Sequence, residues 1–166
     1  MESAIVIRKA TEEEKHVLLT IWLEKVEWLS KNSTPMWDQK QFTLESLKEK
    51  YEYPEYFVCD NGKEIVGGFI LIEYDERYWK DNKEDKAFYF HKFVVRNGYT
   101  GKGYSSVILN WVKEYGKEMG KDYIRLDFDE ERAYLKKMYF SHGFKPIEKV
   151  IADDGHEITK AEYKIL

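Results

Sequence analysis

The spacing of apolar residues changes several times along this chain, and each change marks a predicted strand or helix. Residues 4–8 are rich in β-branched side chains, which predicts a short strand. Thr11 and Glu14 have the spacing of a helix capping box, and the apolar residues after them recur at helical intervals. These positions are Leu18, Trp22, Val26 and Leu29. The pattern predicts a strand followed by a helix that turns one face to the core.

The next part of the chain reads as a loop, a short helix and a hairpin. Residues 30–42 are mainly polar, and Thr43 has the chemistry of a helix N-cap. Residues 56–60 and 64–74 are apolar, β-branched runs on either side of Asn61-Gly62. Because this pair accepts the positive φ angles of a type I′ turn, we expect two adjacent antiparallel strands.

A strand, a glycine-rich segment and a helix follow a charged stretch. Residues 75–86 are charged and predict a loop, whereas residues 87–96 form the most continuous β-like run of the chain. The expected helix after the glycines ends near Gly120, a residue suited to the left-handed conformation of a helix C-terminus. Its apolar stripe consists of Ile108, Trp111, Val112, Tyr115 and Met119.

The C-terminal residues predict a strand, a short helix and a second hairpin. Residues 123–128 are expected to form the strand, and Gly143 is expected to close the helix. Residues 144–151 and 156–165 then pair through Asp154-Gly155. In total the pattern predicts a single α/β domain over residues 1–166, with a mixed, largely antiparallel twisted sheet of about seven strands flanked by about four helices.

Composition excludes several classes of function. The 166 residues carry 27 Lys and Arg against 31 Asp and Glu, and the net charge of −4 disfavours nucleic acid as a main ligand. Cys59 is the only cysteine, so no internal disulfide is possible, and the cysteine and histidines do not show zinc-ligand spacing. No segment has the pattern of a signal peptide or a membrane span. We therefore expect a cytoplasmic protein without a resident metal or a membrane partner.

The glycine-rich segment after the fourth predicted strand has the features of a phosphate-binding loop. Glycines there let backbone N–H groups converge at the start of a helix, where the helix dipole favours an anion. A P-loop is excluded because Gly103 stands where that motif needs Ser or Thr. The pattern Gly101-x-Gly103-x-x-Ser106 followed by Asp127 approximates a dinucleotide-binding fingerprint, and a nucleotide-dependent oxidoreductase is a third-ranked alternative.

Residues 89–149 combine a strand at 90–95, the glycine loop and helix, and the ending Tyr139-x-x-x-Gly143-Phe144. With this combination the sequence resembles the GNAT superfamily of acyl-CoA-dependent N-acetyltransferases. The stretch 124–127 and Met36-Trp37 are similar to a bacterial subgroup that acts on small molecules. Thr100, Ser105 and Arg132 depart from the family pattern, which usually has Arg or Gln, Gly or Ala, and Asn at these places.

The resemblance implies acetyl-CoA as co-substrate and assigns residues to it. The pyrophosphate would bind at Gly101, Lys102, Gly103, Tyr104, Ser105 and Ser106. The backbone of Phe93, Val94 and Val95 would pair with the amide-rich arm, and an N–H there would polarise the thioester carbonyl. Arg132 would face the cofactor, and Tyr139 would act as the general acid that protonates the CoA thiolate.

An amine acceptor has to lose a proton before it attacks. If residues 87–95 form a regular strand, Tyr89 and His91 share a face with Phe93 and Val95, so either one is a possible proton acceptor, directly or through water. Cys59 is expected to be a small buried residue rather than a nucleophile. Four aromatic residues are in loops that flank the acceptor side in the fold that the resemblance implies, and they either form an aromatic wall around an amine or anchor these loops to the surface: Trp37, Phe42, Tyr78 and Trp79.

The sequence as a whole indicates an acetyl-CoA-dependent N-acetyltransferase that acts on a primary amine of a small molecule or peptide. Direct attack in a ternary complex is expected. The departures from the family pattern leave open a non-catalytic module of the same fold that binds CoA or a metabolite. A monomer and a homodimer are both compatible with the sequence.

Overall fold

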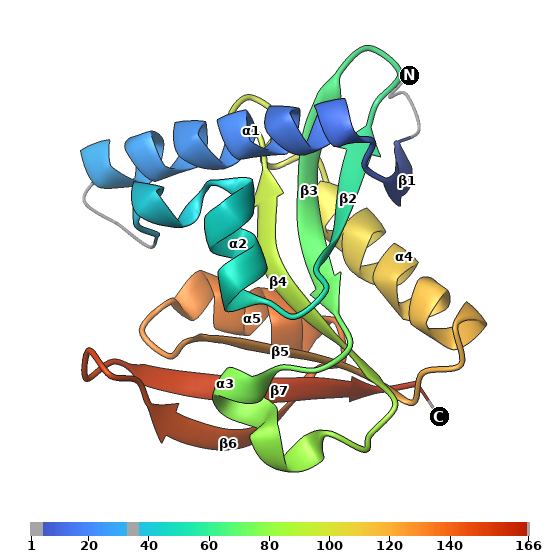
Figure 1. The fold of residues 1–166 in the computed structure, drawn as a ribbon, viewed down its shortest axis with the longest axis vertical. Coiled ribbons are helices and arrows are strands. Elements are labelled where there is room, and N and C mark those ends of the chain that lie inside the picture. Colours follow the sequence, from blue (N-terminus) through green and yellow to red (C-terminus); the bar gives the residue numbers. More distant parts are fainter. Residues whose placement is uncertain (1–4, 33–36, 166) are drawn as a thin grey trace. The chain divides into compact units, whose positions relative to one another are not determined.

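The computed structural model describes residues 5–32 and 37–165. Ala4, Pro35 and Met36, which the sequence assigns to a strand and to a loop, lie outside the described residues. Within these residues the chain forms seven strands and five α-helices (Figure 1). In chain order they are β1 (Val6–Lys9), α1 (Glu12–Lys31), α2 (Leu44–Lys50), β2 (Glu55–Asp60), β3 (Ile65–Ile72), α3 (Glu76–Trp79), β4 (Ala87–Val95), α4 (Tyr104–Glu118), β5 (Tyr123–Asp129), α5 (Ala133–Ser141), β6 (Lys145–Ile151) and β7 (Glu157–Lys164).

The strands follow the order β1-β2-β3-β4-β5-β7-β6. Neighbouring strands are antiparallel in the pairs β1 and β2, β2 and β3, β5 and β7, and β6 and β7. Strands β4 and β5 are parallel, with Tyr89 opposite Arg125. This mixed, largely antiparallel sheet confirms the predicted fold class, and the seven strands match the predicted number.

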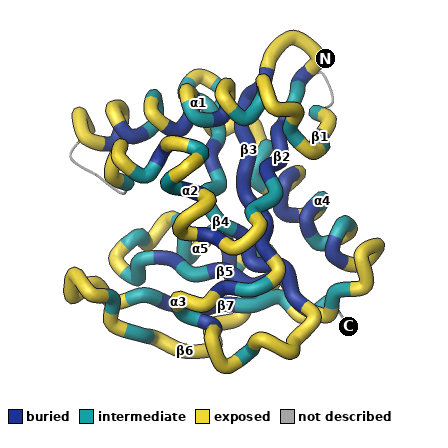
Figure 2. Tube along the Cα trace, viewed as in Figure 1, coloured by how far each residue is buried: buried dark blue, intermediate teal, exposed yellow. Residues whose placement is uncertain are grey.

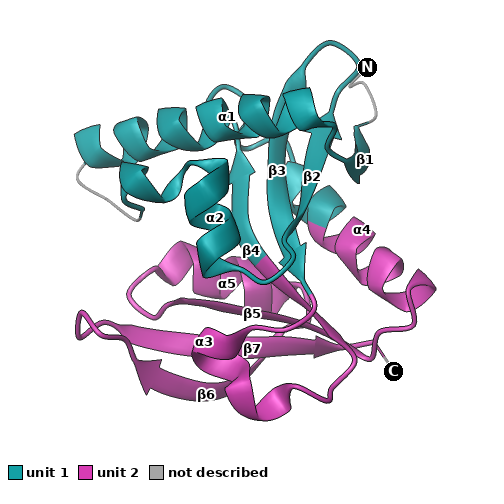
Figure 3. Ribbon diagram, in the orientation of Figure 1, with its two compact units in different colours: residues 1–72, 91–108 teal, residues 73–90, 109–166 magenta. Residues whose placement is uncertain are grey.

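The chain forms two compact units (Figure 3). Unit 1 comprises residues 1–72 and 91–108, and unit 2 comprises residues 73–90 and 109–166. Both β4 and α4 run from one unit into the other, so the chain passes between the units within regular elements. One domain over residues 1–166 stays a prediction.

The core of unit 1 depends on close packing against strand β3, which is buried along its whole length. A Cβ atom on Gly68 would lie 2.4 Å from the carbonyl oxygen of Phe57 in β2 and 2.4 Å from Leu18 Cδ2 in α1, so this position requires glycine. A Cβ on Gly67 would lie 2.4 Å from the carbonyl oxygen of Val94 in β4. The adjacent glycines therefore hold β3 close to a helix and to the strand that carries the predicted cofactor residues.

Unit 2 packs α4 and α5 with strands β5 and β7. Ile124, Leu126 and Ala161 are fully buried, and Gly116 gives room for Ile124, whose Cδ1 would lie 2.7 Å from a Cβ at that position. Strand β6 is exposed along nearly all its length, as Figure 2 shows. Over residues 5–32 and 37–165, no helix combines the length and the apolar character needed to cross a membrane.

The capping residues and the C-terminal glycines seen in the sequence predicted most helix ends correctly. Thr11 and Glu14 form the predicted capping box, and the side chain of Thr43 caps α2 by accepting a hydrogen bond from Ser46 N. Gly120 and Gly143 have φ angles of 76° and 85°, the left-handed values expected where α4 and α5 end. These ends are set by residues within one helical turn, which is why the sequence reveals them.

The turn at Asn61-Gly62 differs from the predicted type I′ turn. Gly62 has a φ of 91°, but Asn61 is not in the left-handed region, which a type I′ turn requires at both positions. The side-chain oxygen of Asn61 instead accepts hydrogen bonds from the N–H groups of Lys63 and Glu64, each at 2.9 Å. This bonding closes a longer loop over residues 61–64 between the same two antiparallel strands.

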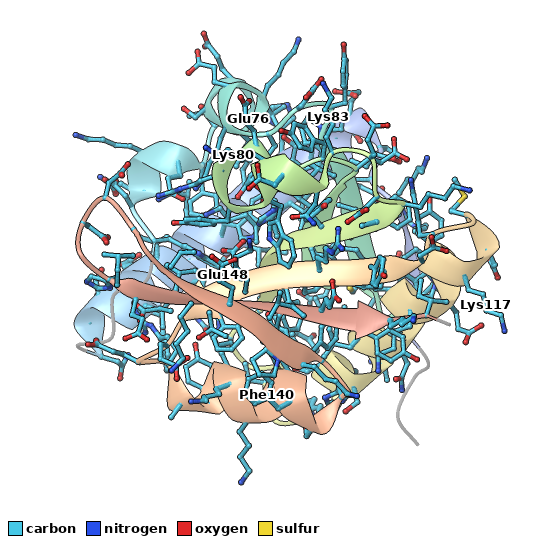
Figure 4. All side chains as sticks on the ribbon, turned by 90° about the horizontal axis from the view of Figure 1, so that it is seen from below. Glu76, Lys80, Lys83, Lys117, Phe140 and Glu148 are labelled. Carbon is cyan, nitrogen blue, oxygen red and sulfur yellow. The ribbon has the colours of Figure 1, made fainter. Side chains whose placement is uncertain are left out.

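Residues 75–86 contain a helix that the sequence analysis interpreted as a loop. The carboxylate of Asp75 caps α3 by accepting from Arg77 N at 3.0 Å, and a 3-10 turn, Lys80–Asn82, follows directly. Figure 4 labels Glu76, Lys80 and Lys83 on this segment. The described residues therefore contain one helix more than predicted, because the side chain of Asp75, in a charged stretch that was expected to be a loop, caps an additional helix.

Helix α4 also departs from its prediction at one position. Ile108 and Val112 are buried as expected, but Met119 is 53% exposed. The helix ends at Glu118, so Met119 lies beyond the apolar stripe.

Candidate functional site

The glycine-rich loop of unit 1 connects β4 to α4. Gly98, Gly101 and Gly103 have φ angles of 95°, 77° and 79°, which L side chains rarely adopt. A Cβ on any of them would meet no atom within 4 Å, so open space adjoins all three. Helix α4 begins at the next residue, Tyr104. The loop thus has open space beside its glycines and leads into the N-terminus of α4, where a helix favours an anion.

The loop is held in place by an ion-pair cluster at its start. Arg96 Nη2 lies 3.0 Å from Glu24 Oε2, and Arg96 Nη1 lies 3.0 Å from Glu64 Oε1. The hydroxyl of Tyr99 donates to Glu64 Oε2 at 2.9 Å. The hydrogen bond that Arg96 donates to Glu24 raises the pKa of the guanidinium, so the charge of Arg96 is compensated by the two carboxylates. Lys102, in the same loop, is exposed.

The stretch Phe93, Val94 and Val95 ends β4 directly before this loop. Val94 is buried, while Phe93 and Val95 are half-buried. The backbone N–H of Arg96 donates to the carbonyl of Val66 at 2.7 Å, which ties the end of β4 to β3. The structure therefore brings this stretch next to the glycine loop within unit 1, as the sequence predicts.

Strand β4 is not regular, which corrects the premise used to place His91. Lys92 has a φ of 55°, a left-handed value in the middle of a strand. Alternation of side chains between faces cannot be carried through such a residue, because it changes the direction of the backbone. The expected common face of His91 with Phe93 and Val95 therefore has no basis in strand periodicity.

His91 packs against an aromatic ring of the same unit. Its imidazole stacks on the ring of Tyr51 with centroids 4.8 Å apart. Tyr51 is buried and ends helix α2, so its position is fixed by the fold. His91 is half-buried, and its role as proton acceptor stays a prediction.

Tyr89, the other predicted acceptor, lies in unit 2 and is buried. Its hydroxyl oxygen accepts a hydrogen bond from Arg125 Nη1 at 3.0 Å. Burial raises the pKa of Tyr89, so the phenol is neutral at pH 7. A neutral, already bonded phenol is a weaker proton acceptor than an imidazole, which favours His91 of the two.

Tyr139 lies on α5 and is buried in unit 2. Its ring contacts Phe128 and Phe144, with centroids 5.5 and 5.9 Å apart. Burial, with a smaller effect of Tyr134 and Asp127, raises its pKa, so the hydroxyl stays protonated throughout the neutral range. A general acid needs this protonation state.

Arg132 is the N-cap residue of α5, and its side chain is half-buried. Its predicted contact with the cofactor stays a prediction. Cys59 is fully buried, and burial raises the pKa of its thiol to about 12. The expectation that Cys59 is a buried residue is confirmed, and a thiol with this pKa is not a nucleophile at neutral pH.

The four loop aromatics occupy different environments. In unit 1, Trp37 packs edge-on against Phe42 with centroids 5.5 Å apart, and Phe42 is buried. In unit 2, Trp79 is buried with the guanidinium of Arg125 5.0 Å and the ammonium of Lys160 4.4 Å from its ring. Trp79 is the last residue of α3 rather than part of a loop, and its buried ring anchors this helix, an outcome that its position in a charged stretch did not indicate.

Two carboxylates lie close together in unit 2. Oxygen atoms of Asp75 and Asp127 lie within 4.8 Å of each other, and Asp75 is buried. Asp127 follows the buried Leu126 on β5, and Asp75 starts α3. Because these residues are 52 positions apart, no local pattern links them. Two close carboxylates favour a cation between them.

Comparisons with known proteins agree with this architecture. The family model described as the acetyltransferase (GNAT) family matches residues 22–144. A GNAT-family acetyltransferase from Listeria monocytogenes is similar in structure, with a TM-score of 0.79 and 21% identity over 96% of this chain and 94% of that chain. No curated protein sequence gives a significant match.

Two further structures of the same fold were determined with a bound cofactor. A putative acetyltransferase from Salmonella typhimurium with acetyl-CoA has a TM-score of 0.70 and 13% identity, over 98% of this chain and 95% of that chain. Spermidine N-acetyltransferase from Vibrio cholerae with CoA and spermine has a TM-score of 0.68 and 16% identity, over 96% and 95%. The family model covers most of the sequence, and the structural matches span nearly all of it. The chain therefore belongs to the GNAT acetyltransferase family.

Proposed function

We propose that this protein transfers an acetyl group from acetyl-CoA to a primary amine by direct attack in a ternary complex. The observation that carries the proposal is the loop of residues 98–103, in which three left-handed glycines lead into α4 directly after β4. Membership of the GNAT family supports acyl transfer. Acetyl-CoA supplies a thioester whose carbonyl carbon the amine attacks, after which the C–S bond breaks and the thiolate leaves.

The residues of the loop fit a pyrophosphate. Gly101 and Gly103 leave open space beside the backbone, and the N–H groups of Tyr104 and Ser105 belong to the first turn of α4, which has no intrahelical acceptors. Lys102 adds a positive charge. The Salmonella and Vibrio proteins of the same fold bind acetyl-CoA or CoA, which supports this assignment.

Strand β4 would hold the arm of the co-substrate. The backbone of Phe93, Val94 and Val95 would pair with its amide groups, and one N–H of this stretch would stabilise the oxyanion as the amine adds. Their side chains serve the core, so the role requires only the backbone. The residue immediately before them, Lys92, has a left-handed φ of 55°, which interrupts the regular strand geometry at this point.

Two side chains would move protons. An amine with a pKa near 10.4 is almost fully protonated at pH 7, so His91 would accept its proton, directly or through water. Tyr139, kept neutral by burial, would donate a proton to the departing thiolate. The proton that the amine loses and the proton that the thiolate gains balance the reaction.

The carboxylate pair favours a cationic acceptor. A second ammonium group of the acceptor near Asp75 and Asp127 would compensate their charges, while the attacking amine of the same molecule loses its proton. The Vibrio relative is named for spermidine and was determined with spermine, a cation of this kind. A small polyamine-like molecule is therefore our first choice of acceptor, ahead of a peptide N-terminus.

The experiment that tests the proposal is a panel of amines with acetyl-CoA, followed by the release of free thiol. The panel should contain polyamines, neutral amines and peptides with a free N-terminus. A reaction without amine corrects for hydrolysis, and mass spectrometry must show the product heavier by one acetyl group. Release that is stimulated by no amine in the panel counts against the proposal.

The departures at Thr100, Ser105 and Arg132 favour one alternative, a non-catalytic module that binds CoA. Titration calorimetry separates it from the enzyme: tight CoA binding without thiol release would favour the module. A nucleotide-dependent oxidoreductase is not proposed, because the family model identifies an acetyltransferase fold.

A further inference from the structure

One non-glycine residue of β4 adopts a conformation that its own chemistry does not favour. Lys92 has a φ of 55° although it carries a side chain. Such a residue keeps a left-handed conformation only where its surroundings determine it. The contacts of Lys92 therefore indicate what fixes the backbone immediately before Phe93, Val94 and Val95.

Both ends of Lys92 are held by unit 1. Its carbonyl oxygen accepts a hydrogen bond from the indole N–H of Trp22 in α1 at 2.8 Å. Its ammonium donates to Gln41 Oε1 at 2.7 Å and lies 5.5 Å from the ring centroid of Trp37 and 5.7 Å from that of Phe42. The ammonium thus reaches the segment of residues 37–42 between α1 and α2.

The aromatic rings that contact the two ends of Lys92 belong to one cluster. Phe42 stacks on Trp22 with centroids 5.3 Å apart, and Trp37 packs edge-on against Phe42. Trp22 and Phe42 are buried, so the cluster is part of the core rather than a mobile surface group. The ammonium of Lys92 is bonded to the side-chain amide of Gln41 and faces two aromatic rings, an arrangement that depends on its exact place.

We propose that Lys92 is a positioning residue that couples residues 37–42 to the backbone of β4. Residues 37–42 then have to contact the ammonium of Lys92 for Phe93, Val94 and Val95 to adopt the geometry that binds the co-substrate. The link to the co-substrate rests on the proposed function, whereas the coupling between the two segments does not. A lysine that only covers apolar surface would show neither the left-handed backbone nor two anchors in one cluster.

The test compares Lys92→Met with Lys92→Arg. Methionine keeps a similar stem but removes the charge and the N–H donors, whereas arginine keeps both. Hydrogen exchange is measured by mass spectrometry on the free protein. Peptides covering residues 37–42 and 91–96 of Lys92→Met should exchange at least about tenfold faster than in the wild type, because the hydrogen bond and the cation–π contact are lost. Lys92→Arg should exchange like the wild type. Lys117→Met, at an exposed position of α4 labelled in Figure 4, is the matched control without effect.

Kinetics separate positioning from a loss of folding. In Lys92→Met the KM for acetyl-CoA should rise about tenfold, while kcat at saturating acetyl-CoA should fall much less. Lys92→Arg should restore most of the KM. If the wild type binds no acetyl-CoA, the proposed function fails, but the exchange experiment still decides the coupling.

Two outcomes would overturn the proposal. One is unchanged exchange of both segments in Lys92→Met. The other is faster exchange throughout, including residues 123–129 of unit 2, with a lower Tm, which would show a general packing role. If Lys92→Met does not fold, Gln41→Ala and Trp22→Phe each remove one anchor at its other end, and each must loosen both segments for the proposal to stand.

Discussion

Arg125 donates a hydrogen bond to the hydroxyl of Tyr89 inside unit 2, across the parallel pair of strands β5 and β4. The same guanidinium bonds to Glu162 at 2.9 Å and to Asp85 at 2.9 Å. Its side chain is only 5% exposed, so these partners replace its hydration. One cation therefore joins β4, β5, β7 and the segment that follows α3.

Substitutions at Arg125 and Tyr89 should lower the free energy of unfolding by unequal amounts. Arg125→Met should lower the free energy of unfolding by about 3 kcal/mol, because it leaves two carboxylates without their cation. Tyr89→Phe should cost about 1 kcal/mol, since only one hydrogen bond to a charged donor is lost. Chemical denaturation measures both values. Equal costs for the two variants would contradict the view that charge compensation dominates.

Glu14 should make the stability of unit 1 sensitive to acid. Its carboxylate bonds to Arg8 at 2.6 and 2.7 Å and to the N–H of Thr11 at 3.0 Å. The hydrogen bond from Arg8 contributes most to lowering its pKa to about 2 from an ordinary value of 4.5. A lowered pKa in the folded state means that the contribution is complete above about pH 4.5 and is lost as the pH falls toward 2.

Glu14→Gln should therefore lower the free energy of unfolding by about 1 kcal/mol at pH 7. This value allows for screening by solvent, because the side chain of Arg8 is 39% exposed. The difference from the wild type should disappear near pH 2. Urea unfolding at several pH values provides the measurement, and Glu13→Gln, an exposed neighbour on α1, is the control. A difference that does not change between pH 7 and 2 would exclude ionisation of Glu14 as its source.

The sequence predicted the elements whose signals are local. Thr11 and Thr43 begin helices with side-chain caps, and Gly120 and Gly143 end them, because each acts on residues within one turn. The glycine loop was also found, because left-handed positions favour a residue without a Cβ.

Other features depend on contacts between distant residues and could not be predicted. The left-handed backbone of Lys92 is held by Trp22, which is 70 positions away, and Arg125 bonds to Tyr89 over 36 positions. Neither lysine nor arginine signals such a role by its type. The expected common face of His91 with Phe93 assumed a regular strand, and the left-handed Lys92 between them removes that basis.

Gly103 offers a test of the cofactor loop. Gly103→Asp should abolish CoA binding, because it places a side chain and a negative charge beside the phosphates. The left-handed backbone itself should cost about 1 kcal/mol of stability. Gly155→Asp is the matched control, because Gly155 has a similar φ of 87° and the same open surroundings, in the β6 and β7 hairpin. Calorimetry should show CoA binding for Gly155→Asp and none for Gly103→Asp; equal affinities would remove the loop from the site.

His91 should determine the acidic limb of the pH profile. If His91 accepts the proton of the amine, kcat/KM should fall at acidic pH, because a protonated imidazole cannot accept a second proton. His91→Gln should lower the rate and flatten this limb. Tyr51→Leu, which removes the ring stacked on the imidazole, should shift the limb without abolishing it. An unshifted limb in His91→Gln would leave water as the acceptor.

Tyr139 gives the sharpest test of the catalytic proposal. Its hydroxyl is neutral at pH 7 because burial raises its pKa, and its proton would pass to the CoA sulfur as the C–S bond breaks. The departing thiolate, whose conjugate thiol has a pKa near 8.5, is a weaker base than a tyrosinate, so the transfer is partial and coupled to bond cleavage. Tyr139→Phe should lower kcat by about 10² to 10⁴, the usual contribution of a general acid.

The same substitution should leave CoA affinity and Tm nearly unchanged, since the ring that packs against Phe128 and Phe144 is retained. Tyr134→Phe is the control, because Tyr134 lies on the same helix but is 58% exposed. Single-turnover thiol release at saturating acetyl-CoA and amine separates chemistry from product release. A rate for Tyr139→Phe within a few-fold of the Tyr134→Phe rate would assign Tyr139 to packing alone, because a hydroxyl that protonates the leaving group cannot be removed at so small a cost.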